Sequence, residues 1–133
     1  FHARPAEVAD RRILLIDDEV QVAYMLKQML EHLGYDVTLH TNSAKALEVF
    51  ADKPDRYDLV ITDQTMPHMT GEELAQEVMK LRPDIPVILC TGFSERITEE
   101  KAGEKGIRAL LLKPVLKQKM AVTIREVLRD DTG

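Results

Sequence analysis

Hydrophobic residues along the chain form five short apolar runs, and each run is followed by a segment whose apolar positions recur at helical spacing. The runs predict buried strands at residues 12–16, 37–40, 59–62, 86–90 and 109–112. The following segments predict helices at residues 20–33, 42–50, 70–81, 94–103 and 116–128. Because a parallel crossover needs a dozen or more residues, this alternation predicts an α/β domain with a doubly wound, five-stranded parallel sheet and helices on both faces.

The length of 133 residues fits one domain with a single fold. We expect that domain at residues 11–130, with a tail or linker at residues 1–10 and a short tail at residues 131–133. The sequence begins at Phe1 without an initiator methionine or an apolar leader, which favours a piece of a longer polypeptide. No apolar run approaches the ~20 residues of a membrane helix, so we expect no membrane contact by this domain.

The charge balance is acidic, with a formal net charge of −5. A nucleic-acid-binding surface needs clustered lysine and arginine, so we expect no nucleic-acid partner for this domain. Cys90 is the single cysteine of the sequence, which excludes an internal disulfide and a multi-cysteine metal site. Its apolar neighbours predict burial as a small hydrophobic residue. These features favour a cytoplasmic location.

Polar residues capable of chemistry stand where the predicted strands end. Asp17 and Asp18 follow the first strand, Asp63 the third, Thr91 the fourth and Lys113 the fifth. Because the carboxyl ends of parallel strands share one edge of a sheet, these side chains are expected to converge on one crevice.

Each of these residues also has an ordinary structural explanation. Asp18 can stabilise a helix N-terminus, and Asp63 can form a turn with its own backbone. Thr91 can be a helix-entry hydroxyl, and Lys113 a solvated residue at a strand exit. The combination of all of them at strand ends, and none of them alone, indicates a functional site.

Three clustered carboxylates repel one another, so the arrangement predicts a cation between them. A small set of oxygen ligands without histidine or cysteine favours Mg²⁺. Such an ion and the amine of Lys113 can neutralise an incoming phosphoryl group, and Thr91 can donate a hydrogen bond to it. The sequence therefore predicts that Asp63 acts as a nucleophile and forms an aspartyl phosphate.

The ordered motifs Asp17-Asp18, Asp63-Gln-Thr-Met-Pro-His-Met-Thr-Gly71, Thr91-Gly92 and Lys113-Pro114 resemble those of the receiver domain of two-component response regulators and hybrid histidine kinases. The resemblance covers roughly residues 11 to 130. It implies a flavodoxin-like (βα)5 fold with strand order 2-1-3-4-5. It also implies a phosphorelay function, with a histidine kinase or phosphotransfer domain as the partner. Whether the domain also forms a homodimer is not decided by the sequence.

The resemblance also assigns roles to individual residues. Asp63 would accept the phosphoryl group, and Mg²⁺ would be held by Asp17, Asp18, Asp63 and the backbone carbonyl of Thr65. Thr91 and Lys113 would contact the phosphoryl oxygens, and the Lys113-Pro114 peptide bond would be cis. The isolated domain would not be an enzyme in the usual sense, because it would catalyse only its own phosphorylation and dephosphorylation.

Two positions bear on the output and on the lifetime of the phosphate. The family often has an aromatic switch residue three positions before the lysine, whereas this chain has Leu110. Phe93, which with Thr65 would flank the phosphoryl group, is expected to hinder the attacking water and slow dephosphorylation. The Leu-Leu-Leu-Lys-Pro run is similar to receivers fused to hybrid histidine kinases, which is an analogy and no more.

Three alternatives compete with this interpretation. A Mg-dependent phosphohydrolase with an aspartate nucleophile would need a second acid two residues after Asp63, where Thr65 stands. A flavin or dinucleotide module would need a glycine-rich loop after the first strand, where Asp17 and Asp18 stand instead. A receiver-like docking scaffold that ignores phosphate would not need the acidic set and Lys113.

Overall fold

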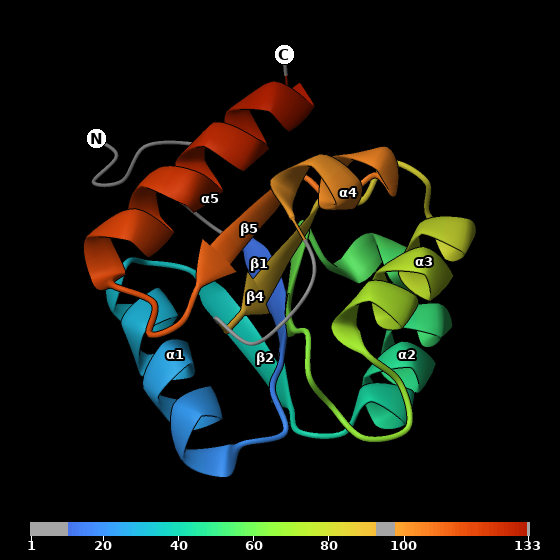
Figure 1. The fold of residues 1–133 in the computed structure, drawn as a ribbon, viewed down its shortest axis with the longest axis horizontal. Coiled ribbons are helices and arrows are strands. Elements are labelled where there is room, and N and C mark those ends of the chain that lie inside the picture. Colours follow the sequence, from blue (N-terminus) through green and yellow to red (C-terminus); the bar gives the residue numbers. More distant parts are fainter. Residues whose placement is uncertain (1–10, 93–97, 133) are drawn as a thin grey trace.

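The chain folds into one sheet of five parallel strands in the order β2-β1-β3-β4-β5 (Figure 1). The structure, a computed structural model, describes residues 11–92 and 98–132. The strands are β1 (Arg12–Ile16), β2 (Asp36–His40), β3 (Leu59–Asp63), β4 (Val87–Thr91) and β5 (Ala109–Leu112). The helices are α1 (Val20–His32), α2 (Ser43–Asp52), α3 (Gly71–Leu81), α4 (Glu99–Glu104) and α5 (Lys117–Thr132), with a short 3-10 turn at Pro54–Arg56. The predicted fold class and strand order are confirmed.

Helices cover both faces of the sheet, as the apolar strand runs predicted. On one face, α1 and α5 pack against strand residues such as Ile13 and Leu15. On the other face, α2, α3 and α4 cover residues such as Leu14, Val60 and Leu89 (Figure 1). The central strands β3 and β4 are buried along their whole length, which explains why their sequences are apolar at consecutive positions, rather than alternating, until the polar residues at their carboxyl ends.

Local signals fix where the helices begin and end. Thr70 and Glu73 form the predicted capping box at the start of α3, because the Thr70 hydroxyl accepts from the Glu73 backbone and Glu73 accepts from the Thr70 backbone. The Asn42 side chain caps α2 by accepting from the Lys45 N–H. Gly34, with φ of 104°, follows the end of α1 in a conformation that suits glycine.

Most helix boundaries lie within two residues of those expected, and the larger differences are in α4 and α5. The helix predicted at residues 94–103 is α4, Glu99–Glu104, whose first turn is capped by the Thr98 hydroxyl; residues 93–97 lie outside the described part of the chain. Weak amphipathicity in this charged segment gave no clear start signal. Helix α5 extends past Leu128 to Thr132 and so enters the segment 131–133 that was assigned to a tail. None of the helices in the described residues combines the length and apolar character needed to cross a membrane.

Candidate functional site

The candidate site lies at the carboxyl edge of the sheet, where the strand register brings the predicted residues together. Residue Asp17 follows β1 and donates its backbone N–H to the His40 carbonyl at the end of β2 (3.2 Å). Asp63 ends β3 opposite Cys90 of β4, and Thr91 pairs with Leu112 at the end of β5. One edge of the sheet therefore carries the polar residues of all these strands, as expected for a parallel sheet.

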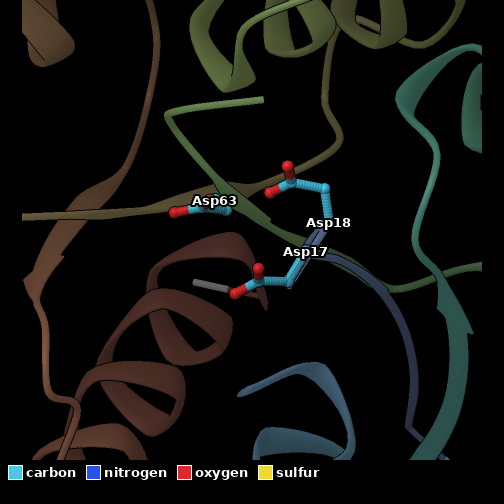
Figure 2. A group of neighbouring side chains, drawn as sticks. All are labelled: Asp17, Asp18 and Asp63. Atoms are coloured by element: carbon cyan, nitrogen blue, oxygen red, sulfur yellow. The ribbon is translucent and has the colours of Figure 1, made fainter. Parts of the chain in front are cut away.

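Three carboxylates meet at this edge. Asp17 and Asp63 are buried, with 1% and 4% of their surface exposed, and Asp18 is half-buried. One oxygen from each carboxylate lies within 4.8 Å of the others, and Figure 2 shows the three side chains gathered at the ends of β1 and β3. At an effective dielectric constant of about 20, two unit charges at that separation repel by about 3.5 kcal/mol. The cluster therefore needs positive charge nearby.

Lys113 supplies one such charge from the end of β5. Its Nζ lies 2.8 Å from Oδ1 of Asp63 and 3.2 Å from Oδ2 of Asp17, and its side chain is 20% exposed. Burial of the amine lowers its pKa, but the hydrogen bond to Asp63 and the charges of Asp17 and Asp63 outweigh that effect, so the pKa of Lys113 lies above its ordinary value. Lys113 is therefore cationic at all physiological pH values. The Lys113-Pro114 peptide bond is cis, as expected.

Thr91 is buried at the end of β4, beside the position of Lys113. Its carbonyl accepts the Lys113 backbone N–H at 2.8 Å, which holds the two strand ends together. Thr91 and Leu110 also line one pocket of about 500 Å³, together with Leu112 and Pro114. The hydroxyl-bearing residue and the leucine that stands at the position of the aromatic switch thus border the same space.

Gly71 is a further site residue that the motif contained but whose role the sequence did not reveal. A Cβ placed on Gly71 would lie 2.2 Å from the backbone oxygen of Asp63 and 2.6 Å from Cδ1 of Leu89. The start of α3 thus presses directly against the backbone of Asp63, and only glycine allows this approach.

The oxygen-only composition of the cluster fits a hard cation that prefers carboxylates, such as Mg²⁺. Asp17, Asp18 and Asp63 each offer an oxygen to such an ion. The predicted fourth ligand, the carbonyl of Thr65, belongs to an exposed loop residue after β3, and its part in metal binding stays a prediction. Phe93, the predicted modulator of phosphate lifetime, lies outside the described residues.

Comparison with known proteins agrees with this fold. The family described as response regulator receiver domain matches residues 13–125. Transcriptional regulatory protein ZraR of Klebsiella oxytoca is 34% identical over 116 residues, which are 87% of this chain and 26% of that protein. Chemotaxis protein CheY of Thermotoga maritima is 29% identical, covering 88% of this chain and 97% of that protein.

The solved structures show the same architecture. A response regulator receiver domain protein from Clostridium thermocellum superposes with a TM-score of 0.87 at 30% identity, covering 92% of this chain and 97% of that one. A CheY-like receiver domain protein from Methanospirillum hungatei gives a TM-score of 0.83 at 28% identity, covering 93% and 98%.

The chain belongs to the response regulator receiver domain family. It is a signalling domain of a two-component system. The chain spans 31% of the length of the Arabidopsis thaliana response regulator ARR14 and 26% of ZraR. A hybrid histidine kinase origin stays a prediction.

Proposed function

We propose that this receiver domain accepts a phosphoryl group on the carboxylate of Asp63, from a phosphorylated histidine of a kinase or phosphotransfer domain, with Mg²⁺ held by the acidic cluster. The observation that carries the proposal is the buried Asp63 carboxylate, 2.8 Å from the Lys113 amine and inside a group of three acids. A structural salt bridge would need one acid for one amine. The surplus of carboxylates favours a site built for a second cation and for phosphate chemistry.

The proposed transfer replaces a P–N bond with an O–P bond. An ionised oxygen of Asp63 attacks phosphorus, an O–P bond forms, and the P–N bond to the donor histidine breaks. The electron pair of that bond stays on the imidazole nitrogen, which takes a proton from solvent. Because the carboxylate attacks in its ionised form, no base has to remove a proton from it. Bound Mg²⁺ would supply positive charge to the transferring oxygens.

The residues of the chain position and stabilise this reaction. Asp17 and Asp18 would hold the ion beside Asp63. An oxygen of each lies within 4.8 Å of an Asp63 oxygen, which fits this role. The Lys113 ammonium group lies 2.8 Å from Asp63, so its charge is available to a phosphoryl oxygen on that residue. The hydroxyl of Thr91, at the end of the adjacent strand, is the proposed hydrogen-bond donor to the product.

Incubation with acetyl phosphate and Mg²⁺, followed by intact mass measurement, tests the proposal. We expect the wild type to gain one phosphoryl group and Asp63→Asn to gain none. Asp58→Asn is the matched control, because Asp58 precedes the same strand at the opposite edge of the sheet, where its carboxylate accepts the Arg12 N–H. Uptake by Asp63→Asn equal to that of the control would refute the assignment. Sustained turnover of small phosphate esters would favour a phosphohydrolase instead.

A further inference from the structure

Gln64, the residue directly after Asp63, is fixed to the first turn of α3 by both ends of its side-chain amide. Its Oε1 accepts the backbone N–H of Glu72 at 2.8 Å, and its Nε2 donates to Oε1 of Glu72 at 3.4 Å. The backbone carbonyl of Gln64 also accepts the Gly71 N–H at 3.0 Å. The segment that follows the proposed phosphoacceptor is therefore joined to the start of α3 by three hydrogen bonds.

Glu72 continues this set of contacts to helix α4. Its Oε2 lies 2.8 Å from Nζ of Lys105, the C-cap residue directly after α4, and 22% of the Glu72 side chain is exposed. The Gln76 side chain, also on α3, donates to the Lys105 carbonyl at 3.0 Å. Helix α4 buries only Ala102 among its six residues. With so little apolar burial inside the helix, these polar contacts contribute to the position of its C-terminal end, together with buried Ile107 that follows it.

The backbone leaves little freedom between Asp63 and α3. Because a Cβ on Gly71 would lie 2.2 Å from the Asp63 carbonyl oxygen, the first turn of α3 cannot come closer to this strand end. A shift of the Asp63 backbone toward α3 must therefore move that turn, which carries Glu72. In closely packed elements of this kind, a small displacement of one element moves its neighbour.

We propose that Gln64, Glu72 and Lys105 form a polar relay that makes the position of α4 depend on the state of Asp63. The inference rests on the proposed function, since phosphorylation is the change that the relay would report. An added phosphoryl group brings a charge of about −1.5 to −2 next to a carboxylate that already contacts Lys113. The contacts around Asp63 must rearrange, and Gln64 and Gly71 are its nearest connections to α3.

Amide hydrogen exchange of the α4 segment, read by mass spectrometry, tests the relay in the presence of Mg²⁺ with and without acetyl phosphate. Gln64→Met and Lys105→Met keep the approximate length of each side chain and remove its polar end. We expect phosphorylation to change the α4 exchange rate in the wild type, and each variant to reduce that change about threefold, as fits a partly exposed ion pair. In the double variant, the phosphorylation-dependent change in α4 exchange should be reduced no more than in the more affected single variant, because both residues belong to one series of contacts.

Lys101→Met is the matched control, since Lys101 is an exposed lysine one turn earlier on the same helix; its α4 response should equal that of the wild type. Equal responses in all variants, or no α4 response in phosphorylated wild type, would overturn the relay and leave the proposed function intact. Intact mass of each sample reports phosphoryl uptake separately. Absence of uptake by the wild type would refute the proposed function, and the relay with it.

Discussion

Replacing Lys113 with methionine removes the ammonium group that contacts both Asp17 and Asp63 but keeps much of the apolar stem. The amine lies 2.8 Å and 3.2 Å from these two buried carboxylates. Breaking a buried ion pair by removing one partner costs about 3–5 kcal/mol. Because the Lys113 side chain is 20% exposed, water screens part of the effect, and we expect a loss of about 2–4 kcal/mol in the free energy of unfolding without divalent ions.

Magnesium should recover more stability in this variant than in the wild type. The ion binds the folded acidic cluster and stabilises it by mass action. In the wild type, the Lys113 amine already occupies oxygens of Asp17 and Asp63 and repels a second cation. Without the amine we expect at least tenfold tighter Mg²⁺ binding, so that saturating Mg²⁺ restores about 1.4 kcal/mol more than in the wild type.

Urea denaturation in EDTA and in saturating Mg²⁺ measures both effects. Lys119→Met is the matched control, because Lys119 is an exposed lysine on α5, and we expect its stability to stay within about 0.5 kcal/mol of the wild type. A Lys113 variant as stable as this control in EDTA would show that the amine does not compensate the cluster. An equal gain from Mg²⁺ in wild type and variant would show that the ion binds elsewhere.

Four further substitutions have expected outcomes. Gly71→Ala should lower the unfolding free energy by about 1–3 kcal/mol, because the new Cβ overlaps the Asp63 backbone oxygen. Gly103→Ala, whose Cβ meets nothing within 4 Å, should raise the unfolding free energy by up to about 1 kcal/mol. Urea denaturation of both variants checks the two signs. Tyr57→Phe should raise the thermal midpoint, because the buried Tyr57 hydroxyl has no hydrogen-bond partner among the described residues; a lower midpoint contradicts this. Burial and a nearby lysine lower the pKa of His40, so the unfolded chain binds a proton at this residue more readily than the folded chain, and the free energy of unfolding falls as pH drops below about 6.5. His40→Gln should reduce the fall in unfolding free energy measured between pH 7 and 5. An identical pH dependence in variant and wild type would argue against this.

The sheet and its edge could be predicted from sequence because their causes are local and repeated. Strands such as β3 and β4, buried on both faces, must be continuously apolar, and parallel connections must be long enough to hold helices. Polar residues at the ends of such strands necessarily share one edge. This is why the sequence alone predicts that Asp63, Thr91 and Lys113, far apart along the chain, lie together.

Other features depend on tertiary packing that no spacing encodes. The shared contact of Lys113 with Asp17 and Asp63 is set by side-chain conformations inside the crevice. The ion pair between Glu72 and Lys105 joins two surface charges that composition alone assigns to solvent. The start of α4 is hard to predict because charged residues continue across it, and the local signal is one hydroxyl, that of Thr98.

The phosphoryl group is expected on the carboxylate of Asp63 and on no other acid of the cluster. Borohydride reduction after incubation with acetyl phosphate and Mg²⁺ converts an aspartyl phosphate to homoserine, and peptide mass mapping then locates the modified residue. We expect homoserine at position 63 and unmodified aspartate at Asp17 and Asp18. Reduction at either of those two residues, or an unmodified Asp63 in a protein that has taken up phosphate, would contradict it.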